Sequence, residues 1–201
     1  SKPYTYQPGV SGRSEINCRY IVKNNVLVFD IKEYDRNAVL VIDPFIVFCS
    51  FSGSSADNWG FTATYGPDGA MFGGGQVYGP GFPTQAGAPQ INFGGGNGYD
   101  MGIIKLSPDG STKMYATYLG GNASDQPHSL VCDNQGNVVV AGRYNSPNYP
   151  VMNNGSVAGG DYDIVITKLN STGGMLGSRK IGGSGLDGAN IVAVRTPGSL
   201  Q

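Results

Sequence analysis

Charged residues are scarce in this chain. Asp, Glu, Lys and Arg together supply 13% of the 201 residues, and the net charge at pH 7 is −1. The usual charged share is about 25%. A basic surface for nucleic acid is therefore missing, and so is a block of like charge for a membrane surface. No apolar run approaches the ~18 residues of a transmembrane helix. We expect a soluble protein with no nucleic-acid partner and no membrane insertion.

Histidine and paired cysteines are also scarce. His128 is the only histidine, which excludes a His-based metal cluster and leaves one residue for any Ser/His/Asp triad. The cysteines Cys18, Cys49 and Cys132 lack a paired spacing, and each lies in an apolar run. We expect buried free thiols. A disulfide between Cys18 and Cys49 is the alternative.

Glycine is abundant, with 33 residues, about twice the usual ~7% share. Together with frequent Ser, Thr and Asn, it predicts a turn-rich β protein with a neutral polar surface. The hydrophobic share of 39% is enough for a core. The chain opens Ser-Lys-Pro without a signal-peptide apolar region, so we expect a processed or excerpted part of a longer protein.

Residues 114–173 contain a pattern that also occurs upstream. At a constant offset of 67 residues the segment matches residues 47–84, so that Phe51 meets Tyr118 and Gly75 meets Gly142. The offset then falls to 63, and the Tyr-Asp pair at 99–100 meets the pair at 162–163. A third, incomplete copy begins at Met175. Such self-similarity indicates an array of one supersecondary unit.

Each complete copy holds four short apolar runs, and glycine-containing turns join the first to the second and the third to the fourth. We predict an all-β fold of β-propeller blades, each a sheet of four antiparallel strands, with about two and a half repeats in the chain. The predicted strands are 61–65, 70–74, 102–106 and 114–119, then 129–133, 138–142, 164–169 and 177–181.

The connections indicate where one blade ends. In a propeller the outermost strand leads to the innermost strand of the next blade, across roughly 14 Å or about three strand spacings. A two-residue hairpin is too short for this, whereas residues 120–128 suffice at ~3.3 Å each. We interpret 120–128 as the crossing between blades. Residues 47–51 resemble an outer fourth strand without a blade before it, and we expect them to close a ring by pairing with the last blade.

The first 44 residues differ from the repeats. Runs at 15–22 and 26–31 flank a turn, a third run covers 38–42, and residues 1–14 are predicted to be irregular or an edge strand. We predict a small antiparallel β unit at 1–44, a fragment of a larger β domain, and a partial propeller at 45–201. Its parts are the orphan strand and crossing (45–59), the first blade (60–119), the second blade (120–181) and the start of a third (182–201).

The repeats resemble the SBBP family, the seven-bladed β-propeller repeat of bacterial secreted proteins. The resemblance rests on residues 116–125, which contain Thr-Tyr-Leu-Gly-Gly, on the strand at 136–142, and on the Tyr-Asp strand and turn at 162–173. Residues 34–36 and 41–44 are similar to the β domain that often precedes such propellers in large secreted proteins, many from Bacteroidota. The resemblance implies an extracellular or cell-surface location, reached by type IX secretion.

The family implies seven blades, where this chain has about two and a half. Even a four-bladed ring would need ~250 residues of repeat, since each blade buries its faces only against its neighbours. We therefore expect as partners the remaining blades of the same protein or another chain in a complex. Alone, the 201-residue chain is expected to be insoluble, to oligomerise, or to fold only in a complex.

Aromatic residues are the candidate ligand contacts. Tyr78 and Tyr144 lie at the long connections between second and third strands, which cluster on one rim of a propeller, and Trp59 is unrepeated. Stacking on a sugar or a peptide is the functional interpretation. The alternative is that the recurring pairs at 82–83 and 149–150, an aromatic residue followed by Pro, fix each loop onto its own blade.

Asp57, Asp125 and Asp187 recur in or near the crossings. A carboxylate there accepts backbone N–H bonds and holds the turn. The alternative is calcium, which takes 6 to 8 oxygens, although no loop has dense Asp spacing. We predict no cofactor. The glycine runs at 73–75 and 94–96 lack the following Lys-Ser/Thr helix of a phosphate loop, so we interpret them as backbone room at bulges and between blades.

Two function classes remain open. The first is a non-catalytic extracellular module for adhesion, for glycan or protein binding, or as a structural scaffold, and the resemblance favours it. The second is part of a propeller enzyme acting on polysaccharide, with its active site in blades outside this chain, because no convergent acids repeat here.

Overall fold

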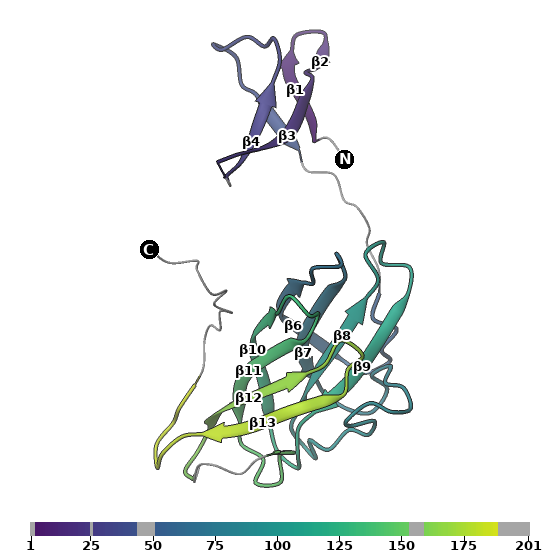
Figure 1. Cartoon of the computed structure of the whole chain (residues 1–201), viewed down its shortest axis with the longest axis vertical. Coiled ribbons are helices and arrows are strands. Elements are labelled where there is room, and N and C mark those ends of the chain that lie inside the picture. Colours follow the sequence, from purple (N-terminus) through teal and green to yellow (C-terminus); the bar gives the residue numbers. More distant parts are fainter. Residues whose placement is uncertain (1–2, 25, 44–50, 153–158, 189–201) are drawn as a thin grey trace. The chain divides into compact units, whose positions relative to one another are not determined.

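A computed structural model of the chain describes residues 3–24, 26–43, 51–152 and 159–188 (Figure 1). The chain divides into two compact units, Ser1–Cys49 and Ser50–Gln201. All strands in the described residues pair antiparallel, which confirms the predicted all-β class. No helix among these residues is long and apolar enough to span a membrane.

The first unit consists of two small sheets. One has the strand order β2-β1-β5, and the other is the hairpin β3-β4. Asn24 follows β3 with a φ of 52°, a left-handed conformation that Asn tolerates at a tight turn. The strands are β1 (Tyr4–Gly9), β2 (Gly12–Glu15), β3 (Cys18–Lys23), β4 (Val26–Ile31) and β5 (Val41–Asp43).

Residues 1–14 were predicted to be irregular or an edge strand, and β2 is an edge strand of its sheet. One expectation for this unit is wrong. Residues 15–22 are not one strand, because the chain changes sheets at Ile16 and Asn17. The Ile16 N–H donates to the Thr5 carbonyl (2.7 Å), whereas the Asn17 carbonyl accepts from the Lys32 N–H (2.9 Å). Apolar alternation continues through the change, so the sequence pattern does not reveal it.

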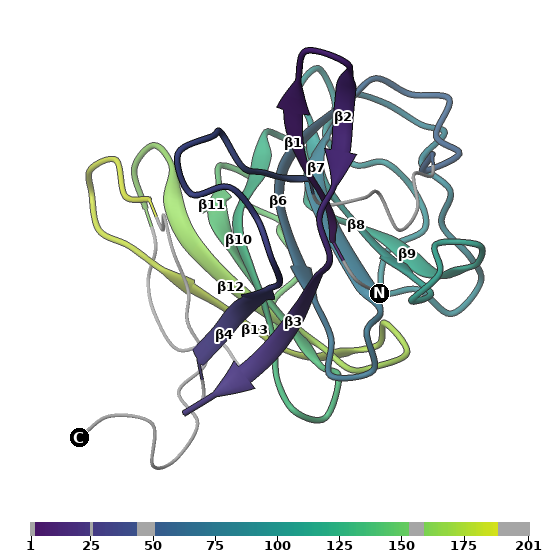
Figure 2. The same cartoon turned by 90° about the horizontal axis from the view of Figure 1, so that it is seen from above.

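The second unit contains two four-stranded sheets (Figures 1 and 2), with the orders β6-β7-β8-β9 and β10-β11-β12-β13. They are propeller-type blades, and each of the eight predicted strands overlaps an observed one. The first blade has β6 (Asn58–Tyr65), β7 (Met71–Val77), β8 (Asp100–Leu106) and β9 (Lys113–Leu119). The second has β10 (Asp125–Cys132), β11 (Val138–Tyr144), β12 (Asp163–Leu169) and β13 (Met175–Ile181).

The hairpin turns depend on glycine, as predicted. A glycine with positive φ lies in each of the four turns that join first to second or third to fourth strands, a conformation that costs glycine little. These are Gly69 (79°), Gly110 (69°), Gly136 (77°) and Gly173 (92°).

The crossing between the blades is shorter than predicted. Asp125 and His128 lie in the inner strand β10 rather than in a nine-residue connection. The strand extends this far because a β-bulge at His128 absorbs one residue while pairing continues beyond it. The first blade has the same bulge at Phe61, so the bulge is a feature of the repeat.

The two blades pack against each other through one buried apolar core. Phe72 and Ile103 of the first blade share this core with Leu130 and Val140 of the second, and each of the four is at most 6% exposed. Gly74 permits the close approach, because a Cβ there would lie 3.2 Å from Leu130 Cδ1. Burying such side chains stabilises by about 1.5–3 kcal/mol each.

Most of the predicted closing strand at 47–51 lies outside the described residues, as does the third copy beyond residue 188. Phe51 is described; it lies outside the strands and is 94% exposed. The ring-closing role of this segment stays a prediction.

Candidate binding surface

Trp59 and Tyr78 come together at one end of the first blade. Trp59 lies near the start of β6 and pairs across the strands with Gln76 of β7, while Tyr78 directly follows β7. The ring centroids of Trp59 and Tyr78 are 6.2 Å apart, and the two residues are 63% and 42% exposed. Two of the three predicted aromatic contacts therefore share one exposed surface.

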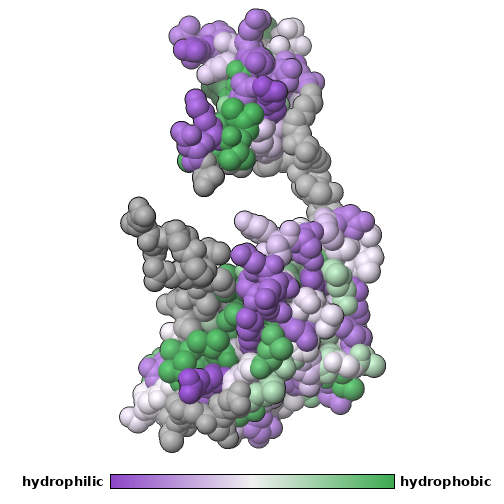
Figure 3. All heavy atoms as spheres, in the orientation of Figure 1, coloured by the Kyte–Doolittle hydropathy of each residue, from purple (hydrophilic) through white to green (hydrophobic). Residues whose placement is uncertain are grey.

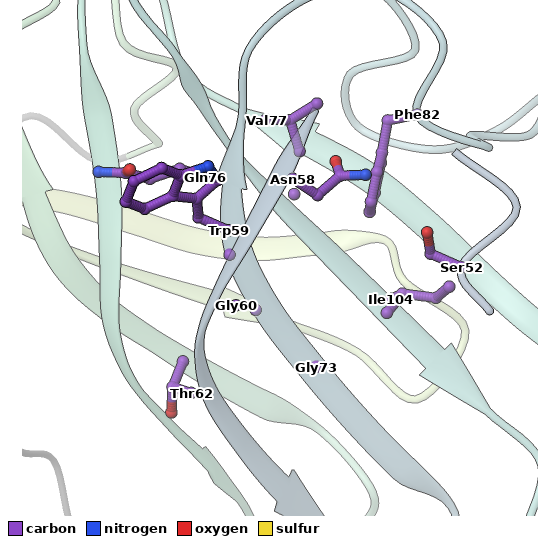
Figure 4. A pocket seen from close by; sticks show the side chains of 13 residues that line it. Ser52, Asn58, Trp59, Gly60, Thr62, Gly73, Gln76, Val77, Phe82 and Ile104 are labelled. Carbon is purple, nitrogen blue, oxygen red and sulfur yellow. The ribbon is translucent and has the colours of Figure 1, made fainter. Parts of the chain in front are cut away.

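Tyr99 continues this surface from the residue before β8. Its ring centroid lies 5.2 Å from that of Tyr78, and burial, followed by the proximity of Tyr99, raises the pKa of Tyr78. The Tyr78 hydroxyl donates to Gln76 Oε1 (2.6 Å). Figure 4 shows the Gln76 side chain beside the Trp59 indole. A neutral amide, held by a hydrogen bond from Tyr78, thus lies beside the Trp59 indole.

The surface reaches the second blade through Tyr162, the repeat equivalent of Tyr99. Burial, followed by a hydrogen bond with Tyr99, raises the pKa of Tyr162. Arg143 Cζ lies 4.5 Å from the centroid of the Tyr162 ring, a cation–π distance. The same guanidinium donates to Gln126 Oε1 at 3.1 and 2.8 Å. We call Trp59, Tyr78, Tyr99 and Tyr162 the aromatic rim.

The second blade has no exposed aromatic side chain at the position equivalent to Trp59. Gln126 takes that position and Arg143 takes that of Gln76, in the same cross-strand register. Gln126 is 6% exposed and is held by Arg143, and an asparagine replaces Tyr78. The fold therefore does not require aromatic residues here, and Trp59 and Tyr78 are additions of the first blade.

A hollow of about 190 Å³ lies beside Trp59 (Figure 4). Its lining includes Gly73, Gly102, Phe82 and Ile104. In the second blade, two buried valines occupy the positions of the two glycines. At Gly73 the hollow has room for a side chain, because an added Cβ would meet only Ile104 Cγ2 at 3.4 Å, whereas at Gly102 the space is filled by Val77 and Phe82. The apolar lining suits a packed side chain.

Tyr144, the third aromatic candidate, is only 5% exposed. Its ring centroid is 5.8 Å from that of Tyr149, and Lys180 Nζ lies 4.6 Å from the Tyr144 ring centroid. Burial, followed by the nearby Asp163, raises the pKa of Tyr144 to about 12. Tyr144 is part of the core rather than of the exposed surface.

Aromatic residues also fix the long loops to their blades. Phe82 is 8% exposed, and its ring packs 5.6 Å from that of Tyr118. The Tyr118 hydroxyl accepts from the Phe82 N–H (2.9 Å) and donates to the Gly79 carbonyl (3.0 Å). Tyr149 of the second blade is 2% exposed. These contacts favour loop anchoring over ligand stacking for Phe82 and Tyr149.

Two of the three recurring aspartates, Asp125 and Asp187, hold backbone turns. Asp125 Oδ2 accepts from the Gly121 N–H (2.8 Å), and Asp187 Oδ2 accepts from the Gly183 N–H (2.9 Å). Asp57, ahead of β6, is exposed. Within the described part of the chain, no three His, Cys, Asp or Glu side chains are placed to share a metal ion. The absence of a cofactor stays a prediction, with calcium as its untested alternative.

Two buried carboxyls meet at the first blade junction. Asp100 and Asp125 are both 0% exposed, and a Cβ on Gly120 would collide with both. Burial, with a contribution from Asp125, raises the pKa of Asp100 to about 7, and burial raises that of Asp125 to about 6. The second junction repeats the arrangement, because burial and Asp187 raise the pKa of Asp163. Such shifts are common at active sites, but these carboxyls are out of reach of a substrate.

Two of the three cysteines can be placed. Cys18 is a buried free thiol and Cys132 a partly buried one, and burial raises the pKa of Cys132. Cys49 lies outside the described residues, so its state as a buried free thiol stays a prediction.

The N-terminal unit matches a known sequence family. The model of a domain of unknown function, DUF7948, matches residues 1–45. No curated protein matches the chain. The match covers 45 of the 201 residues, and its description names no activity.

Tyr99, Tyr162 and Arg143 were not predicted from the sequence to be surface residues. Tyr99 and Tyr162 each precede an Asp at the start of a predicted strand, so the sequence indicates that they are equivalent residues of the repeat. Their proximity to Trp59 depends on how strands far apart in sequence align, and no single segment contains that information.

Proposed function

We propose that this protein is a non-catalytic binding module, an SBBP-type partial propeller that follows a DUF7948 unit in a larger secreted or cell-surface bacterial protein. The observation that carries the proposal is the aromatic rim. Contiguous exposed aromatic side chains are typical of surfaces that bind a ligand or partner. In the second blade, Gln126 and Asn145 occupy the positions of Trp59 and Tyr78.

The chemistry of the described residues supports binding rather than catalysis. The two carboxyls with the most strongly raised pKa values, Asp100 and Asp125, are fully buried. A glycosidase needs two carboxyl groups facing the scissile bond from a solvent-accessible cleft. The rim has no carboxylate among its members.

The proposal is tested by binding and turnover assays on the full 201-residue chain. We expect retention on immobilised glycans or on cell-surface extracts of the source bacterium, with no release of reducing ends from the same glycans. Glycan hydrolysis by the chain, or by the parent protein through other blades, would instead support the enzyme alternative.

The secreted location is tested separately. Antibodies against the chain should detect it in the medium or on intact cells of the source bacterium, which the resemblance places among Bacteroidota that use type IX secretion. Detection only after lysis would contradict this part of the proposal.

A further inference from the structure

Trp59 contributes little to the packing of the first blade. Its side chain is 63% exposed, whereas the equivalent position of the second blade holds Gln126, which is buried. Its described ring contact is with Tyr78, which is itself 42% exposed. The two adjacent, partly exposed rings are tilted by 56° to each other, so they offer two stacking faces that suit successive sugar units rather than one flat ring.

The groups around these two rings are neutral and polar. Gln76 is 5% exposed, and its Oε1 is occupied by the Tyr78 hydroxyl, so the amide orientation beside the indole is fixed. Asn58, the neighbour of Trp59, is exposed and its Nδ2 is held by the Ala56 carbonyl (2.9 Å). Flat aromatic faces bordered by neutral hydrogen-bonding groups suit a ligand with apolar C–H faces and hydroxyls at its edges.

Charge argues against other ligand classes. Arg143 is the cationic group associated with the rim, and it is committed to Tyr162 and Gln126. The chain carries a net charge of −1. An acidic peptide, a nucleic acid or an acidic glycan would meet no free cation among the described residues of the rim.

We infer that the aromatic rim is a saccharide site, with Trp59 and Tyr78 stacking on sugar rings of a neutral glycan chain that continues over Tyr99 toward Tyr162. This inference rests on the proposed binding function and gives its ligand class. Because the rings belong to both blades, a glycan of several sugar units uses the rim better than a disaccharide does.

The single tryptophan of the chain makes a direct test available. The full chain is titrated with cellohexaose, chitohexaose, mannohexaose and maltohexaose, together with hexagalacturonate and decaproline as rival ligands, and Trp59 fluorescence is recorded. We expect a saturable change with at least one neutral hexasaccharide, and an affinity at least tenfold weaker for the corresponding disaccharide.

Variants separate stacking from nonspecific effects. Tyr78→Ala should weaken binding of the responding hexasaccharide by at least tenfold, and Trp59→Ala should do so in calorimetry, where no tryptophan is needed. Tyr65→Ala is the matched control, because Tyr65 lies on the same strand, is 79% exposed and is outside the rim. Circular dichroism spectra should show that all three variants retain the β fold.

Three outcomes would overturn the inference. They are no saturable response to any neutral hexasaccharide, equal weakening by Tyr65→Ala and Tyr78→Ala, and a response to decaproline or hexagalacturonate alone. The last would leave the binding module intact while rejecting its neutral saccharide ligand. Hydrolysis of a bound hexasaccharide would instead reject the non-catalytic function.

Discussion

At the scale of single residues, the buried carboxyl pair of Asp100 and Asp125 makes the first blade junction sensitive to pH. Asp100 Oδ2 accepts from the Gly94 N–H (2.7 Å) and from Gln90 Nε2 (3.2 Å). Its Oδ1 has no hydrogen-bond partner among the described residues. The protonated form therefore suits this site better than the ionised form.

Stability should fall as the pH rises from about 4 to about 7. The folded-state pKa values of about 7 for Asp100 and about 6 for Asp125 lie above the ordinary value of 3.8. The folded protein therefore binds more protons than the unfolded chain in this window, and ionisation favours unfolding. Thermal melts should give a higher Tm at pH 5 than at pH 8.

Asp100→Asn should reduce this difference and raise the Tm at pH 8. Each kcal/mol gained corresponds to about 2–4 °C for a chain of this size. The control is Asp109→Asn, since hydrogen bonds from Ser107 and Ser111 lower the pKa of Asp109 to about 2, and its ionisation is complete at both pH values. An unchanged pH dependence in Asp100→Asn would refute the assignment.

The Tyr118 hydroxyl has a separate structural role, because it closes the first long loop with two buried hydrogen bonds. Tyr118→Phe leaves the Phe82 N–H and the Gly79 carbonyl unpaired, and it should destabilise the fold by about 1–3 kcal/mol. Tyr65→Phe, at a 79% exposed position, should stay within about 0.5 kcal/mol. Urea unfolding measures both, and equal values would show that these bonds are not needed.

At the scale of elements, the β-bulge shifts the pairing register near the start of each inner strand. In the first blade it places Gly75 against the Trp59 carbonyl, where a Cβ would collide with the backbone. At Gly73, on the same face of β7, a Cβ would meet only Ile104 Cγ2 at 3.4 Å. The two glycines therefore differ in the space available to a side chain.

Gly75→Ala should destabilise the fold by about 1–3 kcal/mol, because the new methyl group would force the paired backbones of β6 and β7 apart. Gly73→Ala should be neutral or stabilise by up to about 1 kcal/mol, because alanine restricts the unfolded chain. Denaturant unfolding of the two variants is the test. Similar stabilities would contradict the bulge geometry.

The strands and their order could be predicted from the sequence because the repeat places each apolar run and turn glycine twice. The bulges could not, since neither Phe61 nor His128 interrupts the apolar pattern in a way that marks an extra residue. The crossing was consequently predicted too long. Trp59 could be selected because it is unrepeated, whereas the burial of Tyr144 depends on Tyr149 and Lys180, which come from other segments.

At the scale of the whole molecule, each blade has one face that the other does not cover. Phe72 and Ile103 are 0% exposed between the blades, whereas their second-blade equivalents, Val139 and Ile166, are only half-buried. On the first blade, Met71 is 39% exposed, whereas its equivalent in the second blade is fully buried. Figure 3 shows hydrophobic surface near the end of β13. These two faces match the two sides of the existing interface.

We therefore expect one copy of the chain to add its second blade to the first blade of another copy. Such a head-to-tail contact uses different surfaces on the two copies, so it either closes a ring or continues into longer assemblies. Met71→Glu should weaken the contact, because it places a charge where the second blade buries an apolar residue. Gln135→Glu, at an exposed position in the turn between β10 and β11, should leave association unchanged.

Sedimentation velocity of the purified 201-residue chain over a range of concentrations tests the propeller account most directly. The account predicts association that grows with concentration, or precipitation, and that decreases in Met71→Glu. A monomer at every concentration that melts in one cooperative transition would contradict it, because two open propeller blades would then be stable without neighbours.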